Sequence, residues 1–399
     1  MSRLCPKHEC CGCSACVSVC PRSCISMVAD SEGFFYPSVN ASECINCHLC
    51  TNVCPALAQL TDIKPQGVFA SHNIDNNIVK ISSSGGVFSV LAKHVISKKG
   101  MVYGAEYDEM MNVVFSTADT EEKTNKIRGS KYVQARINDC FKDVRLKLQQ
   151  DVDVLFTGTP CQVAGLKSFL RKPYENLFTM EVVCHGVPSE KVWQKHLQVI
   201  KAKHLDNRNV KNVIFRYKEE DWRSYKICYS TQDGASYLTV RGDDAYFRGF
   251  VRCLYTRPSC EMCLYKNGAS GADLTVGDLW GVERILKDGG NSLGESLVIA
   301  NTEKGMKLLR QNAELLSMKA IDLADAKPYN EGLLEHALPH RNRNSFFQMI
   351  DATEDIDALI DGMLKPNVSE RLKEEKIKIM TLVDRVTCKV YKFYKKISS

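Results

Sequence analysis

Short apolar runs and amphipathic stretches alternate along the chain from Gly67 onward. Runs rich in β-branched and aromatic residues are typical of buried strands, whereas apolar residues three or four positions apart are typical of helices. Strands are therefore predicted at 68–71, 101–107, 113–117, 152–157 and 178–183, and helices at 84–98, 138–149, from the 158–162 turn to about 170, and at 189–203. Strands that alternate with helices of this length favour an α/β domain.

The segments on either side follow different patterns. Residues 25–37 predict a short hairpin that turns near Glu32-Gly33, and antiparallel strands are predicted at 213–217, 225–230 and 237–240. Residues 260–281 are rich in loops, and 306–360 are predicted to be mostly helical. We therefore expect a mixed α+β or α/β protein in four parts: a small N-terminal module at 1–62, an α/β domain at 66–305, a helical extension at 306–364 and a basic tail at 365–399.

The N-terminal module contains the same cysteine motif twice. The copies are Cys10-x2-Cys13-x2-Cys16-x3-Cys20-Pro21 and Cys44-x2-Cys47-x2-Cys50-x3-Cys54-Pro55. This is the spacing of bacterial two-cluster ferredoxins, in which the fourth cysteine of each run binds the other run's cluster. The predicted ligand sets are Cys10, Cys13, Cys16 and Cys54 for one [4Fe-4S] cluster, and Cys44, Cys47, Cys50 and Cys20 for the other. A zinc ribbon is the alternative, but two doubled four-cysteine runs exceed what zinc needs.

Composition places the chain among intracellular proteins. The N-terminus lacks the apolar segment of a signal peptide, and no run approaches the length of a membrane span. We therefore expect the 19 cysteines to be reduced in a cytoplasmic protein. The net charge of +6 lies in residues 365–399, so the rest of the chain is neutral, which argues against a nucleic-acid-binding surface.

The tail spaces its apolar residues as an amphipathic helix does. Ile379, Val383, Val386, Val390, Phe393 and Ile397 alternate with basic residues. Such a helix is compatible with peripheral contact with an anionic membrane, and equally with a terminal helix packed on the body or a short coiled-coil seam.

Four further cysteines occupy positions suited to a ligand set. Cys161 begins a helix after a strand, Cys184 follows a second strand, and Cys260-x2-Cys263 lies in a loop. A helix N-terminus is expected to acidify the Cys161 thiol. Four thiolates are what one more [4Fe-4S] cluster requires, but isolated cysteines are often simply buried apolar side chains. The remaining cysteines are interpreted as structural, and only Cys253 competes for a place in this set: Cys5, Cys11, Cys24, Cys140, Cys228, Cys253 and Cys388.

A glycine-rich segment, Ser82-Ser83-Ser84-Gly85-Gly86, precedes a predicted helix. Free backbone N–H groups at such a helix start can bind a phosphate, although a flexible helix start explains the segment equally well. The chain has neither the dinucleotide fingerprint G-x-G-x-x-G after a strand nor a P-loop.

Residues from about 67 to 302 closely resemble the beta subunits of coenzyme F420 hydrogenases and dehydrogenases, an iron–sulfur flavoprotein family. The matching motifs are Ser83-Ser84-Gly85-Gly86, Gly129-Ser130-Lys131-Tyr132-Val133-Gln134, Gly158-Thr159-Pro160-Cys161-Gln162, Cys184-His185-Gly186-Val187-Pro188-Ser189, Arg257-Pro258-Ser259-Cys260-x2-Cys263, and Ala272-Asp273-x4-Asp278-x-Trp280-Gly281. The resemblance implies a cluster held by Cys161, Cys184, Cys260 and Cys263, beside an FAD bound by the glycine-rich segment, Lys131, Gly158, Thr159 and Asp278.

With its fused N-terminal module, the chain looks like a bacterial branch of this family that is associated with surface-polysaccharide gene clusters. Such hosts often lack coenzyme F420, so the resemblance supports the electron-transfer apparatus more than that substrate.

These observations predict an iron–sulfur flavoprotein oxidoreductase with a small-molecule substrate and a redox partner such as ferredoxin or a partner enzyme. His185 and Lys131 are the candidates for a proton donor or for a charge that tunes the flavin. Two alternatives stay open: a non-catalytic electron-transfer subunit that serves a separate enzyme, and a zinc-bound assembly or regulatory protein.

Overall fold

The computed structural model describes residues 4–58 and 64–366. The predicted tail helix at 365–399, with its proposed membrane contact, falls almost wholly outside the described residues. Within the described part of the chain, no helix has the length and apolar character needed to span a bilayer.

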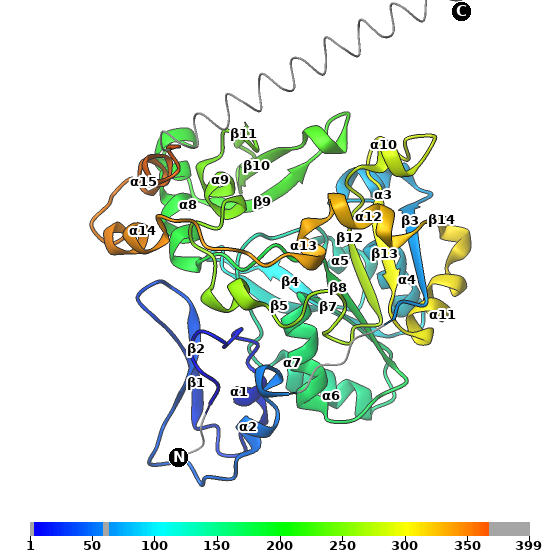
Figure 1. The fold of residues 1–399 in the computed structure, drawn as a ribbon, viewed down its shortest axis with the longest axis horizontal. Helices are drawn as coiled ribbons and strands as arrows, with labels where there is room; N and C mark the ends of the chain where they lie inside the picture. The colour runs from blue at the N-terminus through cyan, green and yellow to red at the C-terminus, as the bar shows by residue number, and fades with distance from the viewer. Residues whose placement is uncertain (1–3, 59–63, 367–399) are drawn as a thin grey trace, which may run out of the picture.

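The N-terminal module is small and built around its two cysteine loops (blue in Figure 1). It contains α1 (Ala15–Val19), β1 (Ile25–Ala29), β2 (Phe35–Val39), α2 (Leu49–Asn52) and the 3-10 helix η1 (Pro55–Leu57). The strands β1 and β2 pair antiparallel, and Gly33 forms the turn with φ of 85°. The hairpin predicted with its turn at Glu32-Gly33 is therefore confirmed.

The two cysteine loops share one backbone conformation. Gly12 and Asn46, the residues before the second cysteine of each run, have φ of 71° and 53°. Ser14 and His48, the residues after it, have φ of 62° and 57°. Left-handed backbone is uncommon outside glycine, and asparagine tolerates it better than most residues. The sequence repeat is therefore also a structural repeat, in which each loop curls in the same way before its short helix.

A nine-stranded mixed sheet forms the body. Its strand order is β14-β3-β13-β12-β8-β7-β4-β5-β6. The strands are β3 (Gly67–Asn73), β4 (Met101–Tyr107), β5 (Val113–Ala118), β6 (Ala135–Arg136), β7 (Val154–Gly158), β8 (Leu177–Val182), β12 (Leu274–Asp278), β13 (Ser296–Ala300) and β14 (Leu316–Ala320). The neighbours β12, β8, β7 and β4 run parallel to one another, so their carboxyl ends meet at one edge. In open α/β sheets this edge is where ligands bind.

Helices cover both faces of the sheet. They are α3 (Asn76–Ile81), α4 (Val87–Ser97), α5 (Glu121–Ile127), α6 (Cys140–Gln149), α7 (Pro160–Leu170), α10 (Val282–Ile285), α11 (Glu303–Gln311), α12 (Leu323–Ala326) and α13 (Glu331–Leu334), with the 3-10 helices η3 (Pro258–Met262), η4 (Ala313–Leu315) and η5 (Lys327–Tyr329). Alternate residues of β7 supply the two cores: Val154 and Phe156 pack with α6 and α7, and Leu155 packs with α4 and α11. This alternation explains why the strand is continuously apolar.

The antiparallel insert forms a second sheet with its own helices. Its strands are β9 (Val210–Tyr217), β10 (Lys226–Thr231) and β11 (Ser236–Val240), as expected from the alternation of residues, with η2 (Trp222–Ser224) between the first two. The helices α8 (Glu190–His204), α9 (Ala245–Val251), α14 (Arg343–Met349) and α15 (Ile356–Met363) pack around it. Trp193, Tyr246 and Phe346 lie at the centre of this core.

The C-terminal extension is mostly helical, as expected, but it also contains a strand. The pattern of 306–360 predicts mostly helix, but Leu316–Ala320 forms β14, which pairs antiparallel with β3. The sheet continues through β14 because β3 would otherwise expose an unpaired edge. The helical extension expected at 306–364 therefore contributes a strand to the body's sheet.

Candidate functional site

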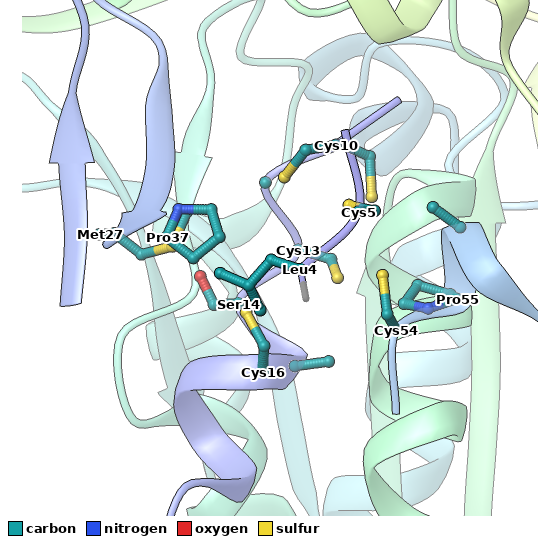
Figure 2. Close-up of a pocket in the computed structure, with 14 residues that line it drawn as sticks. Leu4, Cys5, Cys10, Cys13, Ser14, Cys16, Met27, Pro37, Cys54 and Pro55 are labelled. Carbon is teal, nitrogen blue, oxygen red and sulfur yellow. The ribbon is translucent and has the colours of Figure 1, made fainter. Parts of the chain in front are cut away.

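The first cavity lies in the N-terminal module and is lined largely by cysteines (Figure 2). Its cysteines are Cys5, Cys10, Cys11, Cys13, Cys16 and Cys54. The predicted set Cys10, Cys13, Cys16 and Cys54 thus meets around one cavity, although Cys54 comes from the second copy of the motif. Apolar Leu4, Met27, Pro37 and Pro55 complete the wall.

The second cavity collects the complementary cysteines. Cys20, Cys44, Cys47 and Cys50 line it together with Cys24. The Sγ atoms of Cys20 and Cys24 are 3.4 Å apart. This cavity lies at the outer end of the module, because Cys47 is exposed and the neighbouring Ile45 keeps 59% of its surface accessible.

The protonation of these thiols depends on their neighbours. Burial raises the pKa of Cys16 to about 12. The Cys10 thiol behaves differently, because a hydrogen bond from the Cys5 thiol, against the effect of burial, lowers its pKa to about 7. Cluster ligands must be thiolates, so metal binding would remove these protons. Within the described ranges, no three His, Cys, Asp or Glu side chains are placed to hold a single metal ion.

The third predicted set belongs to the edge where parallel strands end. Cys161 lies in the first turn of α7 just after β7, and Cys184 follows β8, the strand beside it. Cys260 belongs to η3 and Cys263 follows it directly. Electrostatic interactions link Cys161 with Cys184, Cys184 with Cys260, and Cys263 with both Cys184 and Cys260. The four thiols therefore lie near one another.

The expected acidification of Cys161 is wrong for the metal-free thiol. A hydrogen bond with the Cys11 thiol and burial raise its pKa well above the ordinary value. Thr159, the residue before the helix, places its Oγ1 3.2 Å from Cys161 Sγ, and Gln162 Oε1 accepts from the Thr159 N–H at 2.9 Å. Burial likewise raises the pKa of Cys184 to about 11. Burial among other thiols therefore outweighs the helix N-terminus here.

The N-terminal module is firmly joined to this edge. The helices α1 and α7 pack together, and the loop before α1 lies so close to α7 that a Cβ on Gly165 would be 2.7 Å from Cys13 Cβ. Arg257, which directly precedes η3, has no exposed surface and donates from Nε to the Cys10 carbonyl oxygen at 2.7 Å. The Arg343 guanidinium forms an ion pair with Glu32 on the module's hairpin. The first cavity therefore lies against the part of the body that carries the third cysteine set.

The glycine-rich segment lies at the same sheet edge. The Gly85 N–H donates to Ser296 Oγ at 2.9 Å, so it is not among the free N–H groups at this helix start. A Cβ on Gly85 would lie 2.5 Å from the Ser71 carbonyl oxygen, which explains why glycine is needed. Ser83 Oγ accepts from the N–H of Ser130 at 2.7 Å and thereby joins this segment to the Lys131 loop.

Two basic residues on β9 and just after it complete this region, and sequence reasoning missed both. Arg216 and Asp278 form an ion pair with 2.8 Å between Nη2 and Oδ2. Arg216 is 5% exposed, its Nε makes no hydrogen bond, and its guanidinium lies over Tyr225 at 3.9 Å. Lys218 Nζ donates to the carbonyl oxygens of Ser84 at 2.8 Å and Val79 at 3.0 Å. The signal in the sequence that could have pointed to Arg216 and Lys218 is their spacing, two basic residues two positions apart at the end of a predicted strand.

The two candidate catalytic residues have partners of their own. Lys131 Nζ donates to the carbonyl oxygens of Ile127, Arg128 and Gly129 at the end of α5, and burial lowers its pKa to about 7. His185 Nε2 lies 3.3 Å from Cys253 Sγ, and burial lowers the pKa of this imidazole. The neutral form of His185 is therefore favoured at neutral pH.

Comparisons with known proteins found family matches for the N-terminal module and for part of the body. Residues 9–58 match the family described as a 4Fe-4S dicluster domain. Residues 151–324 match the family described as the C terminus of the coenzyme F420 hydrogenase/dehydrogenase beta subunit. No significant match was found among curated proteins.

A chain from a solved structure, the xenon derivative of the F420-reducing [NiFe] hydrogenase complex from Methanosarcina barkeri, aligns with a TM-score of 0.46 and 18% identity. The alignment covers 74% of the present chain and 91% of the other. The two matched segments, residues 9–58 and 151–324, are therefore similar to a 4Fe-4S dicluster domain and to the C-terminal domain of the coenzyme F420 hydrogenase/dehydrogenase beta subunit.

Proposed function

We propose that the protein is an iron–sulfur flavoprotein oxidoreductase that moves electrons between ferredoxin-type clusters and a flavin, and from there to or from an organic substrate. The observation that carries this proposal is the contiguity of the sites. The first cavity borders α7, the helix that carries Cys161 of the third set, because Cys13 packs on Gly165, and the third set and the glycine-rich segment lie at the same edge of the sheet.

Two ligand sets follow from the two cavities. Cys10, Cys13, Cys16 and Cys54 would hold one [4Fe-4S] cluster, and Cys20, Cys44, Cys47 and Cys50 the other. The cavities suit iron–sulfur clusters because thiols from both copies of the motif line each of them, and thiolates are the ligands that such clusters require. When bound, such clusters carry one electron at a time.

A third cluster is proposed at Cys161, Cys184, Cys260 and Cys263. Their thiols lie close enough to affect one another's charge, and Cys260 Sγ accepts a hydrogen bond from the Val187 N–H at 3.4 Å. Backbone N–H groups that point at ligand sulfurs stabilise a negatively charged site. The chain's own contribution here is to hold four thiols from three segments at the carboxyl ends of β7 and β8.

The flavin is proposed at the same edge, beside the third cysteine set. A flavin dinucleotide carries a pyrophosphate, and the buried Nε of Arg216, which makes no hydrogen bond, is suited to such an anion. Ser83, Ser84, Gly85, Gly86 and Lys131 would hold the cofactor together with Gly158, Thr159 and Asp278. Asp278 would act mainly by fixing Arg216, since its carboxylate already pairs with that side chain.

Lys131 and His185 are proposed to hold or accept protons near the flavin. A lysine with a pKa near 7 exchanges a proton readily at neutral pH. The neutral imidazole of His185 is suited to accept a proton rather than to supply one. When bound, the flavin would supply the exchange of two electrons with an organic partner.

A non-catalytic electron-transfer subunit is the second candidate. The family match is to a beta subunit, and the outer cysteine cavity carries exposed Ile45 and Cys47 where a partner protein could exchange electrons. One activity assay distinguishes the oxidoreductase from the electron-transfer subunit. The isolated chain, supplied with dithionite, should reduce a small molecule by itself if it is the oxidoreductase, and should need a partner enzyme if it is only a carrier.

Anaerobic purification with counts of iron, sulfide and flavin tests the cofactor set. Three clusters and one flavin predict about twelve irons and one FAD per chain. A colourless protein with zinc and no flavin would contradict the proposal. Cys161→Ala should remove about four irons and spare the rest, whereas Cys140→Ala, a buried cysteine outside all three sets, should remove none.

A further inference from the structure

Two arginines of the insert lie over the same pair of aromatic rings. The guanidinium of Arg216, on β9, lies 3.9 Å from the ring centre of Tyr225 and 5.4 Å from that of Trp280. The guanidinium of Arg241, the residue after β11, lies 4.9 Å from Tyr225 and 6.0 Å from Trp280. Trp222 packs against Trp280 with 4.8 Å between ring centres. We call these five residues the junction cluster.

The junction cluster lies where the insert meets the carboxyl end of β12. Asp278 is the last residue of that strand, Trp280 follows two residues later, and Arg216 reaches Asp278 through its ion pair. Lys218, two residues after Arg216, donates to the Ser84 carbonyl oxygen in the glycine-rich segment. Ligands bind at this edge in open α/β sheets, so the cluster lies beside the proposed flavin site.

The charges around the junction cluster do not balance. Asp278 pairs with Arg216, but within residues 4–58 and 64–366 no acidic side chain pairs with Arg241 and no group accepts a hydrogen bond from it. Arg241 is only partly exposed, and Trp280 beside it is also half-buried. A guanidinium presents a planar set of N–H donors that suits the two oxygens of a carboxylate or a phosphate. One positive charge of the cluster is therefore left for a ligand.

We propose that the Arg241 guanidinium binds the carboxylate or phosphate group of the organic substrate, beside the half-buried ring of Trp280, so that the substrate is an anionic compound. This inference rests on the proposed function, because it assigns a substrate to the flavin site. The two arginines then bind different anions. Arg216, whose buried Nε makes no hydrogen bond, serves the pyrophosphate of the cofactor, and Arg241 serves the substrate. Because both guanidinium groups contact Tyr225, the charged end of the substrate is held close to the cofactor.

The test measures the binding of small probes to the full-length, anaerobically purified protein by isothermal titration calorimetry. Benzoate carries a carboxylate on an aromatic ring, phenyl phosphate carries a phosphate, and benzamide carries no charge. We expect at least one of the two anions to bind, and benzamide to bind at least about 10-fold more weakly, because it lacks the charged partner of the guanidinium. A preference for benzoate or for phenyl phosphate identifies the anionic group of the substrate, and either preference supports the inference.

Three variants assign this binding to Arg241. Arg241→Met should raise the Kd of the anionic probe about 10–100-fold, through loss of a charged hydrogen-bonding pair. Arg241→Lys keeps the charge but not the planar donor set, so its effect should be smaller. Arg223→Met is the matched control, because Arg223 is next to Trp222 in the sequence but is exposed and already pairs with Asp221. Its Kd should equal that of the wild type.

Iron and FAD content, measured on the same samples, separates the two levels of the proposal. All three variants should keep the iron and FAD of the wild type. A flavin-containing wild type that binds neither anion, or that binds benzamide equally well, would overturn the inference. Unchanged affinity in Arg241→Met would do the same, and so would loss of FAD from that variant, since Arg241 would then serve the cofactor. A wild-type chain without flavin would instead refute the proposed function itself.

Discussion

Arg257 Nε donates to the carbonyl oxygen of Cys10 at 2.7 Å, across 247 residues of sequence. The same guanidinium donates from Nη2 to the Phe35 carbonyl oxygen at 2.9 Å and lies over the Tyr36 ring at 4.2 Å. Because Arg257 directly precedes the segment of Cys260 and Cys263, one buried side chain connects the first cysteine cavity to the third cysteine set.

Replacing Arg257 with methionine should destabilise the protein and empty the first cavity. Methionine fills similar space but leaves two carbonyl oxygens without a donor, which we expect to cost about 2–5 kcal/mol. Thermal unfolding and iron content under anaerobic conditions measure both effects. Arg284→Met is the matched control, since Arg284 is exposed and its guanidinium lies over Tyr329 at the surface. Equal stability and iron content in the two variants would contradict the proposed role.

Gly165→Ala should separate the N-terminal module from α7. The added methyl group would lie 2.7 Å from Cys13 Cβ and 2.9 Å from its Sγ. Overpacking of this kind costs about 1–3 kcal/mol, and loss of about four irons from the first site should accompany it. Gly362→Ala in α15 is the control, because no atom lies within 4 Å of the position its Cβ would take. Full iron in Gly165→Ala would show that the interface tolerates the group.

Double variants test the exchange of the fourth cysteine between the two motifs. Cys10 and Cys54 line one cavity, so Cys10→Ala combined with Cys54→Ala should remove about four irons, no more than either change alone. Cys20 lines the other cavity, so Cys10→Ala combined with Cys20→Ala should remove about eight. Four irons lost from the second pair and eight from the first would mean that each motif binds its own cluster.

Arg216→Lys should weaken flavin binding while the iron content stays unchanged. Lysine keeps a positive charge near Asp278 but lacks the planar guanidinium, whose Nε makes no hydrogen bond in the structure. Loss of one or two charged hydrogen bonds predicts a rise of about 10–100-fold in the Kd of FAD, or about 1.5–3 kcal/mol. Fluorescence titration of flavin-free protein measures it. Arg241→Lys is the control, because Arg241 also lies over Tyr225, at 4.9 Å. Equal affinities would refute this placement of the flavin.

His196 should make stability depend on pH in the alkaline range. Burial disfavours its charged form, but Asp244 and Asp357 outweigh burial and raise its pKa to about 9, with 2.7 Å between Nδ1 and Asp357 Oδ1. A raised folded-state pKa stabilises the protein fully below the unfolded pKa of about 6.5, and this contribution is lost as pH rises through about 9.

Denaturant unfolding of wild type and His196→Gln should therefore differ most below about pH 6.5, and the difference should shrink by up to about 3 kcal/mol by about pH 9–10. His204→Gln, at an exposed position on α8 where the ring stacks on Tyr237, is the control for loss of an imidazole from the same helix. A constant difference for His196→Gln would mean that its pKa is not raised in the folded protein.

The pattern of residues was sufficient for features that depend on short stretches of chain. The doubled cysteine spacing predicted which residues gather in each cavity, and the strand and helix positions from 101 to 204 agree with the structure to within a few residues. Leu316–Ala320 was missed because this short strand exists only through its pairing with β3, a partner about 245 residues earlier.

The sequence by itself determined the cysteine loops, because ligand spacing and the left-handed turn at Gly12 or Asn46 are local properties of the backbone. Only the tertiary structure decided that Cys13 packs against Gly165 of α7, that Arg257 holds the Cys10 loop and that Arg216 pairs with Asp278. The physical reason is that each of these contacts joins segments distant in sequence, and their meeting depends on how the sheet, α7 and the insert pack together.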